Sequence, residues 1–232
     1  MLRLNEKVAL ITGAKGGLGG IVTQAFLDAG ATVIGVSRSI AATDFPHPNF
    51  AAMPAELASS EAAQHLVDAA VARFQRIDAL VHLVGGFAGG KSVAETDDAT
   101  LERMIELNLR SAFFLARAIV PQMRLQGSGR ILAVGSRAAV EPSPMSGVYG
   151  AAKAALVSLI RTLAAENKDK CISANIVLPG TMDTPANRAA EPQADFSTWV
   201  QPPQVAGMLL HLASDTAAQV SGAVIPVYGR SL

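Results

Sequence analysis

Short apolar bursts alternate with helical patterns along all 232 residues, and this alternation constrains the fold more than any other feature. The first bursts, residues 8–11 and 31–36, are continuous and rich in β-branched side chains, which is typical of strands buried on both faces. A helix predicted over residues 21–29 lies between them, and Gly30 provides its stop. Strands and helices that alternate at this spacing predict right-handed crossovers. The expected fold class is α/β, a doubly wound, Rossmann-type parallel sheet with helices on both faces.

The same pattern continues to the end of the chain. Further strands are predicted at residues 50–53, 79–84, 131–134, 176–178 and 224–227, and further helices at 60–74, 101–112, 151–165 and 205–212. Pro226 lies inside the last strand and has no N–H to donate, which places that strand at the edge of the sheet. No linker, repeat or low-complexity tract divides the chain. Residues 1–232 are therefore expected to form one domain.

Composition argues against several classes of protein. Nineteen basic residues balance nineteen acidic ones, and a neutral chain disfavours nucleic acid or an anionic membrane as a partner. No stretch has the roughly 18 consecutive apolar residues of a membrane span, and the first seven residues lack the apolar core of a signal peptide. The single cysteine, Cys171, fits a reducing compartment, so a cytoplasmic location is expected. The histidines and Cys171 show no metal-ligand spacing, and no metal is expected.

A glycine-rich stretch, residues 12–20, joins the first predicted strand to the first predicted helix. Its spacing is T-G-x-x-x-G-x-G, with Gly13, Gly17 and Gly19 at the glycine positions. Glycines there let the backbone approach a pyrophosphate, and the helix N-terminus presents free N–H groups to it. A turn that merely tightens the strand–helix junction is the alternative. The position of this glycine-rich stretch after the first strand of an α/β chain favours dinucleotide binding.

The end of the second predicted strand favours NADP(H) over NAD(H). Ser37 and Arg38 stand where a carboxylate would otherwise accept hydrogen bonds from the ribose hydroxyls. A guanidinium beside hydroxyls suits a 2′-phosphate, and Lys15 adds positive charge from the glycine-rich loop. An exposed arginine without a ligand is the alternative, and NAD(H) stays open.

Four polar residues form the candidate catalytic group. Tyr149 and Lys153 are four apart and share a helix face, where an ammonium would lower the pKa of a phenol from about 10 and make it a general acid or base. Ser136 ends a predicted strand, at the sheet edge where open α/β folds bind ligands. Asn108 lies on the apolar stripe of its helix, where a buried amide needs partners. A satisfied core asparagine is the alternative reading of Asn108.

Taken together, these residues resemble the short-chain dehydrogenase/reductase family in its compact single-domain form. The resemblance covers nearly the whole chain, from residues 12–19 through the four polar residues to Pro179, Gly180, Thr184 and the closing segment 221–229. It implies that Asn108, Ser136, Tyr149 and Lys153 form a catalytic tetrad, and that the protein is a homo-oligomer, a tetramer or else a dimer. The residues expected to contact the cofactor are Gly13, Lys15, Gly17, Leu18, Gly19, Ser37, Arg38, Glu56, Leu57, Val84, Gly85, Tyr149, Lys153, Pro179, Gly180, Met182 and Thr184.

The chain departs from the family pattern in two places. The family usually has Asn-Asn-Ala-Gly after the fourth strand, whereas this chain has His82-Leu83-Val84-Gly85. We expect His82 to be a packed structural residue that takes over part of the bracing by the missing amides. The family also often has Asp after the third strand, where Glu56 is the nearest match.

The resemblance implies hydride transfer between a nicotinamide and a carbonyl or alcohol, with reduction of a 3-oxoacyl group or a small ketone favoured. Segment 87–91 faintly resembles the Gly-Gly-aromatic-Ala-Gly-Gly segment of dihydropteridine reductases, so a pteridine or quinone substrate is an alternative. A non-catalytic dinucleotide-binding regulator is the second alternative, although such relatives usually lose Tyr or Lys. A short substrate loop is expected at about 181–201, where Phe196 and Trp199 either close a lid or pack against the body.

Overall fold

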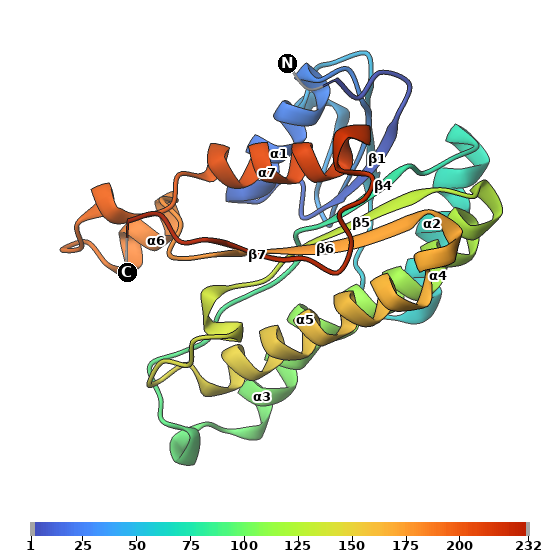
Figure 1. The fold of residues 1–232 in the computed structure, drawn as a ribbon. Coiled ribbons are helices and arrows are strands. Elements are labelled where there is room, and N and C mark those ends of the chain that lie inside the picture. Colours follow the sequence, from blue (N-terminus) through green and yellow to red (C-terminus); the bar gives the residue numbers. More distant parts are fainter. Residues whose placement is uncertain (1–2, 231–232) are drawn as a thin grey trace.

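The computed structural model describes residues 3–230, and its centre is one seven-stranded sheet (Figure 1). The strand order is β3-β2-β1-β4-β5-β6-β7, and every neighbouring pair is parallel. This confirms the predicted doubly wound α/β fold. The order reverses between β1 and β4, which is where such sheets bind ligands beyond the carboxyl ends of their strands. The strands are β1 (Val8–Thr12), β2 (Thr32–Ser37), β3 (Phe50–Pro54), β4 (Ala79–His82), β5 (Gly129–Val134), β6 (Ile172–Pro179) and β7 (Val224–Val227).

Helices cover both faces of the sheet. On one face α1 and α7 lie side by side, and on the other α2, α4 and α5 enclose a second hydrophobic cluster (Figure 1). Because both faces are covered, all eight residues of β6 are buried, as expected for a parallel sheet. The helices are α1 (Gly17–Asp28), α2 (Ser60–Phe74), α3 (Asp98–Ile105), α4 (Ser111–Gln126), α5 (Gly147–Glu166), α6 (Pro185–Ala190) and α7 (Pro202–Ala213).

Some predicted boundaries are wrong. The first helix begins at Gly17 instead of residue 21, because the last glycines of the phosphate loop already have helical conformation. The fourth strand ends at His82 instead of residue 84, and the sixth runs from Ile172 to Pro179 instead of 176–178. The edge position predicted for the strand that contains Pro226 is confirmed, since β7 has only β6 as a neighbour.

The helix predicted over residues 101–112 is interrupted. Residues Glu106–Arg110 form a π-helical turn between α3 and α4, in which the Ser111 N–H donates to the Glu106 carbonyl. Such turns are frequent at functional sites. Asn108 lies inside this one and is completely buried.

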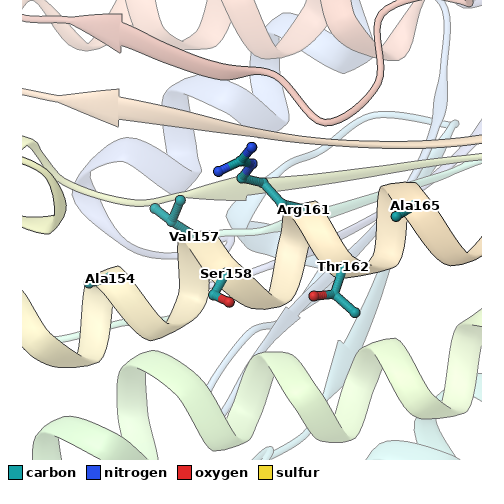
Figure 2. A pocket seen from close by; sticks show the side chains of 6 residues that line it. All are labelled: Ala154, Val157, Ser158, Arg161, Thr162 and Ala165. Atoms are coloured by element: carbon teal, nitrogen blue, oxygen red, sulfur yellow. The ribbon is translucent and has the colours of Figure 1, made fainter.

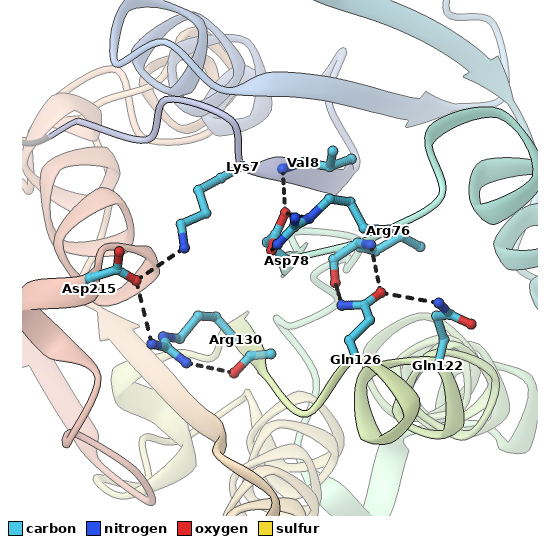
Figure 3. A network of polar contacts seen from close by, with 10 residues as sticks. Lys7, Val8, Arg76, Asp78, Gln122, Gln126, Arg130 and Asp215 are labelled. Carbon is cyan, nitrogen blue, oxygen red and sulfur yellow. Dashed lines mark hydrogen bonds and ion pairs between the residues drawn. The ribbon is translucent and has the colours of Figure 1, made fainter.

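A polar network closes the amino edge of the sheet (Figure 3). The Asp78 carboxylate accepts the Val8 N–H at 2.8 Å and a 2.6 Å bond from the Arg76 guanidinium. The Gln126 amide accepts the Ile77 N–H and donates to the Ile77 carbonyl, both at 3.0 Å. These bonds fix the starts of β1 and β4, and the candidate site lies at the opposite edge.

Among residues 3–230, helix α5 alone is long and apolar enough to cross a membrane, with a mean hydropathy of 1.3. It packs against β6, and Leu156, Ile160 and Leu163 point into the hydrophobic cluster of that face. One side of α5 thus belongs to the core of this face.

Candidate active site

Two glycines around the loop between β1 and α1, Gly13 and Gly19, have no room for a side chain. Gly13 has a φ of +67°, and a Cβ there would lie 3.2 Å from the Leu83 carbonyl carbon. A Cβ on Gly19 would collide with the Gly13 carbonyl oxygen, and one on Gly17 would lie 3.7 Å from Cγ2 of Thr184. Close approach of backbone to backbone therefore requires glycine at Gly13 and Gly19.

The N-terminus of α1 is open to an anion. Its N-cap, Gly16, makes no side-chain capping bond, and no acidic residue lies in the first turn. The free N–H groups and the positive end of the helix dipole therefore face the glycine cradle. This cradle fits the pyrophosphate of a nicotinamide dinucleotide, and Gly13, Gly17, Leu18 and Gly19 are the residues that would hold it.

Two basic residues lie at the carboxyl end of β2, and both have acidic neighbours. Nζ of Lys15 lies 3.0 Å from a carboxylate oxygen of Asp44 and donates to the Ser39 carbonyl at 3.1 Å. The backbone N–H of Lys15 donates to the Ser37 hydroxyl at 3.2 Å. Arg38 is exposed, and its guanidinium lies 3.7 Å from the Glu56 carboxylate.

Sequence reasoning missed Asp44, which lies in a short 3₁₀ turn that carries no recognisable pattern. It also grouped Leu57 with Glu56 on the cofactor side. Leu57 is only 9% exposed and packs in the hydrophobic cluster beside Val36 and Leu66. The side chain of Leu57 thus contributes to the core.

The structure brings Ser136, Tyr149 and Lys153 together at the carboxyl edge. Ser136 lies two residues beyond the end of β5, and its hydroxyl accepts the Ala138 N–H at 3.2 Å. It lies close enough to Tyr149, on the first turn of α5, to influence the pKa of the phenol. Lys153 lies one turn further along α5 and is 5% exposed. Its Nζ donates to the Val134 carbonyl at 3.0 Å and lies 6.0 Å from the centre of the Tyr149 ring.

Asn108 reaches the same place from the π-helical turn. Its Oδ1 accepts the Gly86 N–H at 3.1 Å, and its Nδ2 donates to the carbonyls of Gly86 at 2.9 Å and Met104 at 3.1 Å. A Cβ on Gly85 would lie 2.8 Å from Asn108 Oδ1 and 3.2 Å from Lys153 Nζ. Asn108 and Lys153 therefore meet over Gly85, and the asparagine fixes the loop that follows β4.

Burial shifts the pKa values of the two central groups in opposite directions. It lowers the pKa of Lys153 to about 8 and raises the pKa of the Tyr149 phenol, and the nearby Ser136 hydroxyl offsets part of the rise for Tyr149. The expectation that Lys153 lowers the phenol pKa is therefore wrong for this arrangement. The reason is geometric, since the ammonium donates to Val134 instead of contacting the phenol oxygen.

The remaining predicted cofactor residues lie along the same edge. Val84 and Gly85 follow β4, Pro179 ends β6, and the Gly180 N–H donates to the Val227 carbonyl at 3.0 Å. Thr184 caps α6 by accepting the Asn187 N–H at 3.3 Å.

Segment 181–201 is closed on itself at its base. Met182 and Val200 pair in a parallel bridge, the Val200 N–H donates to the Thr181 carbonyl, and the Asp183 N–H donates to that of Val200. Trp199 is 7% exposed, and Phe196 packs on it with ring centres 4.8 Å apart. Of the two interpretations of these aromatic residues, packing against the body is the one the contacts favour.

Comparison with known proteins identifies the family. A family model described as short chain dehydrogenase matches residues 7–195. The chain belongs to the short-chain dehydrogenase/reductase family. Residues 7–195 include the glycine cradle, Asn108, Ser136, Tyr149 and Lys153.

Relatives of this dehydrogenase match it from end to end. Short chain dehydrogenase adrF of Penicillium roqueforti is 30% identical over 98% of this chain and 97% of its own. The 2-dehydro-3-deoxy-D-gluconate 5-dehydrogenase of Pseudoalteromonas atlantica is also 30% identical, over 97% of this chain and 96% of its own. A crystal structure of 3-ketoacyl-(acyl-carrier-protein) reductase from Brucella melitensis, complexed with NADH, matches with a TM-score of 0.88. It is 26% identical, and the match covers 98% of this chain and 99% of that one. The two names that state a substrate differ in it, so family membership supports a nicotinamide-dependent oxidoreductase and no single substrate.

Proposed function

We propose that this dehydrogenase reduces a ketone or 3-oxoacyl carbonyl with NADPH. The observation that carries the proposal is the convergence of Ser136, Tyr149 and the buried Lys153 at the sheet edge that holds the glycine cradle. A hydroxyl and a phenol that converge on one point suit a carbonyl oxygen on which negative charge develops. A bound nicotinamide dinucleotide would supply the hydride to the carbonyl carbon.

Each member of the group has a role in this proposal. Tyr149 donates its proton to the carbonyl oxygen, and the raised pKa of its phenol keeps that proton in place at neutral pH, which suits reduction. Ser136 donates a hydrogen bond to the same oxygen. Lys153 provides positive charge behind the phenol and, as the family resemblance implies, a contact to the ribose. Asn108 holds the loop after β4 by its two bonds to Gly86.

Arg38 and Lys15 support a preference for NADPH over NADH. Ser37 and Arg38 occupy the end of β2, where a carboxylate would accept bonds from the ribose hydroxyls. Two cations lie there, paired with the Asp44 and Glu56 carboxylates of other segments. The 2′-phosphate would bind between them by charge-assisted hydrogen bonds.

The experiment measures the oxidation of NADPH by its loss of absorbance in the presence of ketones, aldehydes, quinones or 3-oxoacyl thioesters. Tyr149→Phe should lower kcat by ~10²–10⁴-fold on any carbonyl that the wild type reduces, with NADPH affinity unchanged. Tyr228→Phe, which changes the other tyrosine of the chain, should keep most of the turnover. Turnover by Tyr149→Phe at the wild-type rate would refute the proposal. NADPH binding without reduction of any compound would favour a regulator, and reduction of quinones alone a quinone-type reductase.

The outer face of α5 supports the proposal of a homo-oligomer. Small side chains and one arginine line a shallow groove of about 470 Å³ there, formed by Ala154, Val157, Ser158, Arg161, Thr162 and Ala165 (Figure 2). Small residues let a second helix approach closely, and a closed symmetric assembly would cover this face. We expect a tetramer, or else a dimer, by light scattering. A 24.0 kDa particle at micromolar concentration would contradict this proposal.

A further inference from the structure

We propose that Phe87, Val93 and Met145 form an apolar wall beside Tyr149, which selects carbonyl substrates with a bulky apolar group next to the carbonyl carbon. This inference rests on the proposed function. The Phe87 ring packs edge-on against the Tyr149 ring, with centres 5.0 Å apart and planes at 80°. Phe87 therefore lies beside the ring whose hydroxyl would meet the carbonyl oxygen of a substrate.

The wall is apolar and open to solvent. Phe87 is 66% exposed, Val93 73% and Met145 52%, although large apolar side chains are costly to leave in water. Exposed apolar side chains that gather at one place mark a binding site more often than single ones do. These three gather around the first turn of α5, which carries Tyr149.

Backbone contacts hold the wall in place. The Gly90 N–H donates to the Met145 carbonyl at 2.9 Å, which joins the loop after β4 to the loop before α5; the two lie side by side in Figure 1. A Cβ on Gly89 would lie 2.5 Å from Cζ of Phe87, so the ring folds back over a glycine. A Cβ on Gly147 would likewise lie 2.6 Å from Cγ2 of Val93.

Met145 has a backbone conformation that fits a functional position. Its φ of +62° is uncommon for a residue with a side chain. Strain of this kind persists where the surrounding structure enforces it, often at ligand sites. The bond from Gly90 is part of that enforcement.

The charges near the wall do not suit an anionic substrate group. Lys91 is the basic residue closest in sequence to Phe87, and its ammonium lies 3.1 Å from the Asp97 carboxylate. A carboxylate or phosphate on this side of the carbonyl would meet an aromatic ring, a thioether and an isopropyl group. Alkyl or ring carbons would instead be removed from water.

The test is a series of methyl ketones from acetone to 2-octanone. For the wild type, kcat/KM should rise about fourfold for each added CH2 that the wall buries. Phe87→Ala should flatten this dependence while it changes the acetone rate only a few-fold. The control is Leu125→Ala, which removes an 85% exposed leucine at the far end of α4 and should keep the wild-type dependence. No dependence in the wild type, or the same dependence in Phe87→Ala, would overturn the inference.

A binding measurement separates this inference from the proposed function. With NADP⁺ in place of NADPH, a ketone binds but cannot accept a hydride. 2-Octanone should then raise the Tm of the wild type and of Leu125→Ala, and raise that of Phe87→Ala much less. A rise in Tm that depends on Phe87, without turnover of any ketone, would contradict the proposed function and still support the apolar wall as a binding surface. Equal rises in the wild type and in Phe87→Ala would overturn the wall, whatever the turnover.

Discussion

The Thr12 hydroxyl lies 3.1 Å from Nδ1 of His82, and the two residues are register partners at the carboxyl ends of β1 and β4. The Leu83 N–H donates to the same hydroxyl oxygen. Nε2 carries the imidazole proton and donates to the Ser111 hydroxyl at 3.3 Å, which in turn donates to the Leu107 carbonyl at 2.9 Å. The chain of bonds ties the centre of the sheet to the π-helical turn that carries Asn108.

His82 should make the protein sensitive to acid. Burial, with the Lys153 charge as a smaller cause, lowers the pKa of His82 to about 3. Below a pH of about 6.5 the imidazole of His82 is therefore protonated in the unfolded chain but stays neutral in the folded protein. The free energy of unfolding should fall with decreasing pH by up to about 1.4 kcal/mol per unit from this residue.

Urea unfolding at pH 7 and pH 5 checks this prediction. Wild type should lose about 2 kcal/mol more than His82→Gln between the two pH values. His65→Gln, which changes an exposed histidine of α2, should behave like the wild type. An equal loss in His82→Gln and wild type would show that His82 is protonated in the folded state.

Gly19 and Gly20 should respond in opposite ways to alanine. A Cβ on Gly19 collides with the Gly13 carbonyl, so Gly19→Ala must move the cradle and should weaken NADPH binding at least tenfold. A Cβ on Gly20 meets nothing within 4 Å, and alanine should stabilise the helix there by about 0.5–1 kcal/mol. Fluorescence titration with NADPH and urea unfolding measure both effects. Equal NADPH affinities in the two variants would show that the glycine cradle does not bind the dinucleotide.

Lys153 should destabilise the dinucleotide-free protein at neutral pH. Its pKa is about 8 in the folded protein because burial disfavours the ammonium, against 10.5 for an exposed lysine. Between these values the unfolded chain binds more protons, so the free energy of unfolding should rise with pH by up to about 1.4 kcal/mol per unit.

Lys153→Met should lack that rise. Comparing urea unfolding of wild type and Lys153→Met at pH 7.5 and 9.5 isolates the contribution of Lys153, because His82, whose pKa the Lys153 charge lowers, is neutral throughout this pH range. Parallel changes in the two proteins would mean that Lys153 keeps an ordinary pKa when folded.

Arg38→Ala should separate the two cofactors. We expect NADPH binding to weaken by about 1.5–3 kcal/mol, the range for a hydrogen bond to a charged group, and NADH binding to stay nearly constant. Arg73→Ala, which removes an exposed arginine of α2, should change neither affinity. Similar losses for NADPH and NADH would remove the 2′-phosphate assignment.

The fold was predictable because its elements are encoded locally. Continuous β-branched runs such as residues 31–36 identify buried strands, and Pro226 identifies an edge. The π-helical turn was not predictable, since Asn108 enters it through bonds to Gly86, 22 residues away. The ion pair between Lys15 and Asp44 and the contact between Phe87 and Tyr149 likewise join distant segments. Such contacts depend on how loops pack, which no local pattern records.

Proline occupies the outer side of both edge strands. In β7 the carbonyls of Ala223 and Val227 accept bonds from β6. Backbone groups of successive residues in a strand point to opposite sides, so the backbone of Pro226 faces away from β6. In β3 the Asn49 carbonyl and the Ala55 N–H bond to β2, so Pro54 faces outward as well. Each free edge thus lacks a donor that an incoming strand would need. The sheet is therefore protected at both ends against edge-to-edge aggregation through continued strand pairing.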